Sequence, residues 1–125
     1  MALVTNDTAE AVIGCAIRVH RQLGPGLYES VYQGCLALEM TRLCLEYQEQ
    51  AAVGITYDGV HLPGAFRADF IVQGDLVVEI KSIEQVLPLH NRQVLTYMRL
   101  SGITKGLLIN FNVSLLKQGL RSFVL

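Results

Sequence analysis

The sequence has 125 residues, of which 51% are hydrophobic and 17% are charged. This length and composition predict one domain, residues 1–125, with a single hydrophobic core, and they exclude a disordered chain. The formal net charge of −1 gives no overall attraction to nucleic acid or to a membrane surface. Contact with a polyanion would therefore need a local basic patch.

A cytoplasmic protein without a membrane partner is expected. No apolar run approaches the roughly 20 residues of a membrane-spanning helix, and the first residues lack the basic and apolar regions of a signal peptide. The three cysteines, Cys15, Cys35 and Cys44, lack C-x-x-C spacing. We expect buried free thiols rather than a disulfide, a zinc site or an iron–sulfur cluster.

Two helices are predicted in the first third of the chain. From Ala9 to Leu23 apolar residues recur at helical spacing, and His20 continues this buried stripe. An inward-pointing histidine is either a core residue held by a hydrogen bond or a metal ligand. Gly24-Pro25-Gly26 ends this helix, and a second helix of about residues 28–45 follows. Glu29 lies in its first turn, where the helix dipole favours an acid, and its place beside the apolar face leaves a role in a site open.

A three-strand antiparallel meander follows these helices. Residues 46–57 predict the first strand, and Asp58-Gly59 is typical of a hairpin turn. The return strand starts at Val60, with a bulge or break at Pro63-Gly64. The third strand, residues 76–81, follows the loop of residues 73–75.

The hairpin of residues 66–81 contains the charged residues around which the prediction is built. A period of two gives the first strand an apolar face, comprising Phe66, Ala68, Phe70 and Val72. If the loop has three residues, Asp69 lies opposite Glu79 and Arg67 lies opposite Lys81. Opposed carboxylates, with Cβ atoms roughly 4.5–5.5 Å apart, destabilise an ordinary sheet. A Mg²⁺ ion would compensate them, because it binds carboxylates, waters and substrate phosphates. A hairpin with a solvated charged face is the alternative.

The last third of the chain predicts a helix and a buried strand. The helix runs from residue 87 or 88 to 100, and Gln93 and Tyr97 are neighbours on its face beside the core. Residues 104–111 predict a strand parallel to its neighbour, because a crossover helix precedes it. Residues 115–125 form either a helical turn or an edge strand. The result is an α/β fold with a small mixed sheet flanked by helices.

This order of elements, with D-x(9)-E-x-K across a hairpin, resembles the PD-(D/E)xK nuclease superfamily and its restriction-endonuclease-like core. Residues 26–32, G-L-Y-E-S-V-Y, resemble the motif of the GxxExxY family. The segments F-R-A-D-F-I-V, V-V-E-I-K, Q-V-L-T-Y and G-L-L-I-N-F fall in the order that this family shows. The resemblance covers about residues 9–120.

The resemblance implies a metal site on the hairpin. Asp69 and Glu79 would ligate Mg²⁺ or Mn²⁺, with the carbonyl of Ile80 joining them. Lys81 would orient the attacking water or stabilise the charge of the pentavalent phosphorus. His20 lies where some RecB-like enzymes have a metal-binding histidine.

The resemblance also assigns roles to helical residues. Gln93 and Tyr97 match the Q-x-x-x-Y helix of the RecB-like branch, which positions the scissile strand and braces the site. Glu29 resembles the helix-borne acid of several branches of the superfamily.

A Mg²⁺-dependent nuclease acting on DNA is therefore expected, because a metal, a lysine and orienting groups are the parts needed for phosphodiester hydrolysis. Two alternatives remain: a non-catalytic nuclease-fold module that binds nucleic acid or a protein, and an enzyme for a small phosphodiester. A homodimer would extend a small basic footprint. The basic residues available for such a patch are Arg18, Arg21, Arg67, Arg92, Arg99 and Lys105.

Overall fold

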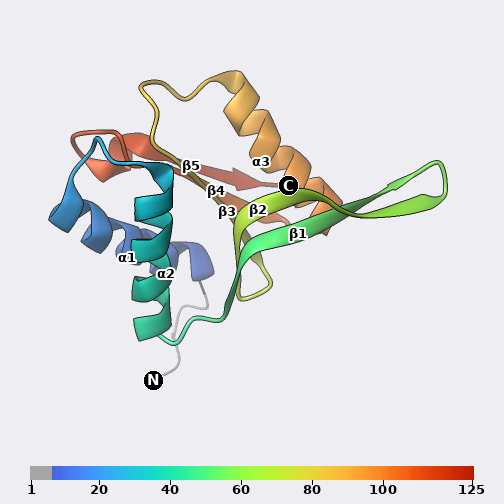
Figure 1. Ribbon diagram of the computed structural model, residues 1–125, viewed down its shortest axis with the longest axis horizontal. Coiled ribbons are helices and arrows are strands. Elements are labelled where there is room, and N and C mark those ends of the chain that lie inside the picture. The colour runs from blue at the N-terminus through green and yellow to red at the C-terminus, as the bar shows by residue number, and fades with distance from the viewer. Residues whose placement is uncertain (1–6) are drawn as a thin grey trace.

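The protein folds into a five-stranded mixed sheet between two layers of helix (Figure 1). The computed structural model describes residues 7–125, and residues 1–6, most of the segment searched for a signal peptide, lie outside the described part. The elements are α1 (Thr8–Leu23), α2 (Glu29–Arg42), β1 (Tyr47–Tyr57), β2 (Val60–Val72), β3 (Leu76–Lys81), α3 (Pro88–Ser101), β4 (Lys105–Asn110) and β5 (Leu120–Val124). The predicted α/β class is confirmed.

The strands lie in the order β1-β2-β3-β4-β5. The first three form the predicted antiparallel meander, and β4 pairs parallel to β3 after the crossover through α3. For the end of the chain, both alternatives occur in succession. A 3₁₀ turn, Leu116–Gly119, leads into β5, which pairs antiparallel at the edge of the sheet. Among the helices of residues 7–125, none combines the length and apolarity that crossing a bilayer requires.

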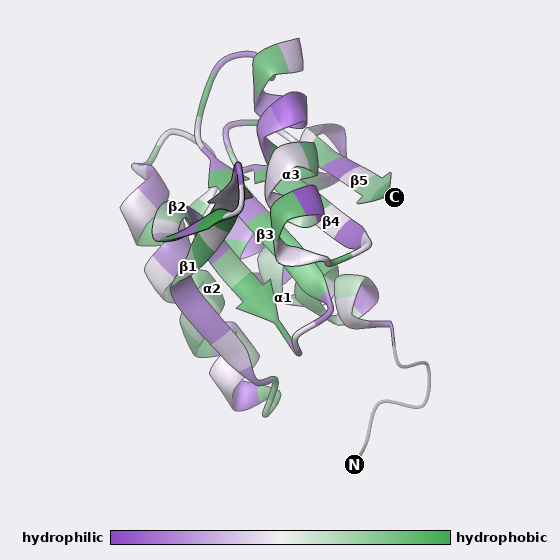
Figure 2. Ribbon diagram, turned by 90° about the vertical axis from the view of Figure 1, so that its right-hand side faces the viewer, coloured by the Kyte–Doolittle hydropathy of each residue, from purple (hydrophilic) through white to green (hydrophobic). Residues whose placement is uncertain are grey.

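Two buried hydrophobic layers lie on opposite faces of the sheet, and the hydrophobic segments follow its central strands in Figure 2. One layer packs against α1 and α2, and the other packs against α3. Because side chains of a strand alternate between faces, β3 gives Val78 and Ile80 to the first layer and Val77 to the second. The α3 face of β3 is therefore also the face of Glu79 and Lys81.

Strand β2 changes the face to which its apolar residues point. The sequence places four of them on one face: Phe66, Ala68, Phe70 and Val72. Instead, Phe70 and Val72 lie in the layer of α1 and α2, whereas Ala68 and Phe66 pack in the layer of α3. The single apolar face was wrong because the pairing with β1 is interrupted at Asp69, between Phe70 and Ala68. Such a break in a ladder increases the local twist.

The predicted irregularity at Pro63-Gly64 is a bulge. The register moves from Val53 opposite Phe66 to Ile55 opposite Leu62, so β2 has extra residues between these pairs. Beyond the bulge, β1 and β2 continue as a two-stranded arm that extends past the rest of the sheet (Figure 1).

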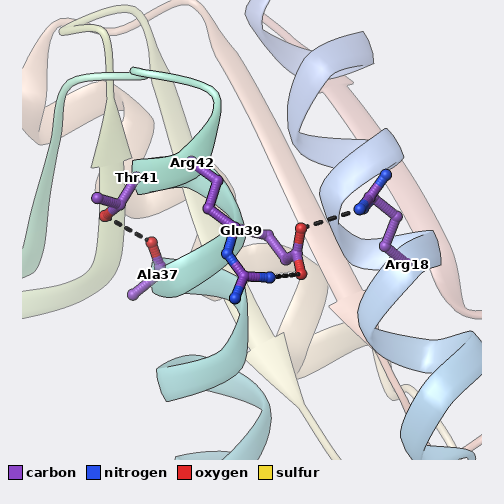
Figure 3. Close-up of polar contacts among 5 residues, drawn as sticks. All are labelled: Arg18, Ala37, Glu39, Thr41 and Arg42. Carbon is purple, nitrogen blue, oxygen red and sulfur yellow. Dashed lines mark hydrogen bonds and ion pairs between the residues drawn. The ribbon is translucent and has the colours of Figure 1, made fainter.

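Helices α1 and α2 are joined by an ion-pair cluster (Figure 3). Glu39 of α2, only 8% exposed, accepts from Nε of Arg18 on α1 at 3.1 Å and from Nη1 of Arg42 at 3.3 Å. Helix α2 ends at Arg42, earlier than expected, so Cys44 lies in the following turn and is exposed. All three cysteines are free thiols, as predicted, but only Cys15 is buried.

Two glycines should respond in opposite ways to alanine. A Cβ at Gly106 of β4 would lie 2.9 Å from Cγ1 of Val94 and would also meet Sδ of Met98, both on α3. We expect Gly106→Ala to lower the free energy of unfolding by about 1–3 kcal/mol. A Cβ at Gly34 of α2 meets nothing within 4 Å, so Gly34→Ala should raise it by about 0.5–1 kcal/mol. Urea unfolding measures both, and equal stability of the two variants would contradict this packing.

Candidate functional site

The β2–β3 hairpin has the predicted register. Val72 pairs with Leu76, so the loop has three residues, and Phe70 pairs with Val78. Asp69 and Glu79 are the next residues on the two strands and would form the next pair of the ladder. The regular pairing stops before them, so their backbone groups need other partners.

Each carboxylate takes the place of a missing ladder hydrogen bond. The backbone N–H of Asp69 donates to Oε1 of Glu79 at 2.9 Å. The backbone N–H of Ile80 donates to Oδ2 of Asp69 at 2.8 Å. The two side chains therefore lie between the separating strands, and their acidic groups occupy one small region.

The site concentrates negative charge. Burial raises the pKa of the Glu79 carboxyl to about 8, and the charges of Asp69 and Glu29 add to this effect, while the Asp69 N–H and Lys81 oppose it. Glu79 is only 4% exposed. Burial, followed by the charge of Glu79, also raises the pKa of Tyr97. In the absence of a cation, a proton on Glu79 thus relieves the repulsion between the carboxylates.

Lys81 is linked to both predicted residues of α3. Its Nζ donates to Oε1 of Gln93 at 3.2 Å, and Nε2 of Gln93 donates to the hydroxyl oxygen of Tyr97 at 3.0 Å. The ammonium and the phenol thus fix which way the amide of Gln93 points. The ring of Tyr97 lies against that of Phe66, with centroids 5.5 Å apart. This chain of contacts holds the ammonium beside the carboxylates.

Glu29 reaches the end of β3 from the start of α2. Its Oε2 accepts from the backbone N–H of Ser82 at 3.3 Å. The hydroxyl of Ser82 in turn donates to the carbonyl of Leu27 at 2.5 Å. Because its charge also acts on Glu79, Glu29 belongs to the same acidic group.

Tyr32 shapes the loop that presents Glu29. The side chain is fully buried, and its ring stacks on Phe111 with centroids 4.4 Å apart. Its hydroxyl donates to the carbonyl of Gly24 at 2.6 Å and accepts from the N–H of Leu27 at 3.2 Å. The tyrosine of the G-x-x-E-x-x-Y motif therefore braces the turn before the glutamate.

His20 is not brought to the other predicted site residues by any contact within residues 7–125. It is buried, as predicted, and its Nε2 donates to the carbonyl of Val113 at 2.8 Å. It lines a separate cavity of about 530 Å³, together with Arg21, Pro25 and Lys117. These contacts are those of a histidine held in the core.

Two residues of the site were not predicted from the sequence: Gln50, which contacts Asp69, and Asn110, which lies opposite Lys81 on the neighbouring strand. Gln50 of β1 donates from Nε2 to Oδ1 of Asp69 at 3.1 Å. Asn110, 3% exposed at the end of β4, accepts from the N–H of Ile83 at 3.1 Å and donates to its carbonyl at 2.9 Å. Asn110 fixes the chain directly after Lys81. Asn110 could have been recognised from the sequence, because it is the single polar residue at the end of the apolar run L-L-I-N. Gln50 could not, because it lies in the uniformly polar segment Q-E-Q.

The donor set suits a magnesium-type ion. Within residues 7–125, no three histidine, cysteine or acidic side chains form a complete metal cage. Mg²⁺ does not need one, because it commonly binds one or two carboxylates and keeps several waters or phosphate oxygens. Asp69 and Glu79 would supply the carboxylates, and the adjacent carbonyl of Ile80 is a further oxygen.

One comparison with known proteins is informative. The model of a family described as the PD-(D/E)XK nuclease superfamily matches residues 6–123. No curated protein and no solved structure matches the sequence significantly.

Without divalent metal, the protein should lose stability as the pH rises from 4.5 to about 8. In this interval the folded state keeps a proton on Glu79 that the unfolded state releases, so the free energy of unfolding falls. One pKa unit corresponds to about 1.4 kcal/mol, so the loss amounts to several kcal/mol. Glu79→Gln should abolish it. Between pH 5 and pH 9, urea unfolding in EDTA should show the stability of the variant rising relative to that of wild type. A stability difference that does not change with pH would contradict the raised pKa of Glu79.

Tyr32→Phe should loosen the loop before Glu29. The variant keeps the stacking on Phe111 but leaves the half-buried carbonyl of Gly24 and the N–H of Leu27 without their partner. We expect a loss of about 1–3 kcal/mol in unfolding free energy and faster hydrogen exchange at Leu27. Tyr47→Phe, which removes an exposed hydroxyl contact, is the matched control and should change stability by less than about 0.5 kcal/mol. Unchanged exchange at Leu27 would refute this role.

Proposed function

Because the chain belongs to the PD-(D/E)XK nuclease superfamily, we propose that it is a metal-dependent nuclease that hydrolyses phosphodiester bonds in DNA. The observation that supports this function best is the pair of carboxylates, Asp69 and Glu79, each bonded to the backbone of the opposite strand. An idle fold would have no need to hold two acids together at this cost in stability.

Asp69, Glu79 and the carbonyl of Ile80 would hold Mg²⁺ or Mn²⁺. When bound, the ion polarises a phosphoryl oxygen and lowers the pKa of a bound water, which supplies a nucleophile near neutral pH. His20 is left out of this ligand set, because none of its contacts within residues 7–125 brings it to the two carboxylates.

Lys81 supplies positive charge to the reacting phosphate. A fixed ammonium stabilises the charge that develops in the transition state more than mobile water does, because it needs no reorganisation. Gln93 and Tyr97 keep the ammonium in place through their hydrogen bonds. This use of a glutamine and a tyrosine one helical turn apart favours the RecB-like branch, and the motif at residues 26–32 favours the GxxExxY family.

A cleavage assay tests the proposal. Wild type should cut linear, circular or single-stranded DNA with Mg²⁺ or Mn²⁺ and stop in EDTA. Lys81→Ala should lower the rate by about 10²–10³, the usual effect of removing one charge-stabilising group. Lys117→Ala removes a lysine that lines the separate His20 cavity and should leave the rate unchanged. Equal cleavage by Lys81→Ala would indicate a contaminant and contradict the proposal.

Calorimetry with Mn²⁺ separates this function from its alternatives. Wild type should bind the ion and Asp69→Ala should not. Absence of binding to wild type would remove the catalytic proposal and favour a non-catalytic module. Metal binding with hydrolysis of bis-p-nitrophenyl phosphate, but without DNA binding, would point to a small phosphodiester.

A further inference from the structure

Gln50 has a backbone conformation that is rare in a strand. Its φ is 50°, in the left-handed region, although it lies in the middle of β1. The neighbouring pairs, Glu49 with Phe70 and Ala51 with Ala68, are regular, but the pair between them is missing. A residue other than glycine is strained in the left-handed region, and such backbone strain is concentrated at functional sites.

The side chain of Gln50 connects β1 to the acidic site and to α2. Its Nε2 donates to Oδ1 of Asp69 at 3.1 Å and to Oε1 of Gln33 at 2.9 Å. Both contacts are solvent-exposed. Exposed hydrogen bonds contribute little to stability, so they do not by themselves explain why the strain is tolerated.

Gln33 determines which end of the Gln50 amide faces Asp69. Nε2 of Gln33 donates to Oε2 of Glu49 at 2.9 Å, which leaves its Oε1 toward Gln50. Because Oε1 of Gln33 is an acceptor, the Gln50 amide must turn its nitrogen, and not its oxygen, toward Gln33. The same nitrogen then also faces the Asp69 carboxylate. Glu29 and Gln33 are four residues apart on α2 and therefore share a face of the helix.

We propose that Gln50 is a positioning residue that aims the Asp69 carboxylate at the metal, an inference that rests on the proposed function. The N–H of Ile80 holds Oδ2 and Gln50 holds Oδ1. A carboxylate has about four acceptor positions, so two hydrogen bonds fix its orientation and leave positions for a cation. The strained backbone places the Gln50 side chain beside Asp69, and Gln33 keeps the amide nitrogen of Gln50 directed at the carboxylate.

Gln50→Gly separates positioning from a structural role. Glycine adopts a positive φ without strain, so the variant should have an unchanged or higher urea midpoint. Loss of an outer partner of a metal ligand typically weakens metal binding 10–100-fold, and we expect a loss of this size in Mn²⁺ affinity by calorimetry on the full chain. Gln48→Gly, the same change two residues away on β1, should lower the midpoint and leave the affinity unchanged.

The remaining variants complete the test. Gln33→Met should weaken Mn²⁺ binding less than Gln50→Gly, and the double variant should bind like Gln50→Gly alone, because the two act through one contact. If Gln50→Gly binds Mn²⁺ within twofold of the wild-type affinity while Asp69→Ala no longer binds it, this inference is overturned and the proposed function is left intact. Absence of Mn²⁺ binding to wild type would overturn both.

Discussion

The site depends on the exchange of hydrogen bonds between two carboxylates and two backbone N–H groups. A hairpin normally satisfies its N–H groups by strand pairing, but here the pairing stops after Phe70 and Val78. Asp69 and Glu79 replace it with their own oxygens. Because each acid is bonded to the strand of the other, neither can turn away without leaving a part-buried N–H unpaired. The same bonds that close the sheet therefore hold the acids together.

Burying the Glu79 carboxyl beside a second acid lowers the stability of the fold and keeps an ionisable group in the site. A buried carboxyl beside another acid resists ionisation, and burial is the largest cause of the raised pKa of Glu79. A site that only needed to be stable would replace Glu79 with an apolar residue, since Val77 on the same face lies in a continuous hydrophobic layer. Retaining the acid makes sense if a cation takes the place of the proton.

The sequence predicted what depends on local chemistry. The three-residue loop and the alternation of residues 70–80 agree on one register, so Asp69 and Glu79 come next along the two strands. The break opposite Asp69 was not predictable, because Gln50 has a positive φ there that is rare outside glycine, and the segment Q-E-Q contains no glycine to indicate it. For His20, periodicity gave its burial but not its partner, since Val113 lies 93 residues away.

Local charge, and not the net charge of −1, governs how such a site would meet a phosphodiester. The charges of Asp69 and Glu29 both act on Glu79, and Lys81 opposes them. As it stands, this cluster repels a phosphate, because like charges at close range in a buried site are poorly screened. At this site, a near-neutral chain can therefore bind a polyanionic substrate when its affinity for that substrate is coupled to a cation. For such a protein, the absence of a strongly basic composition is no argument against nucleic acid.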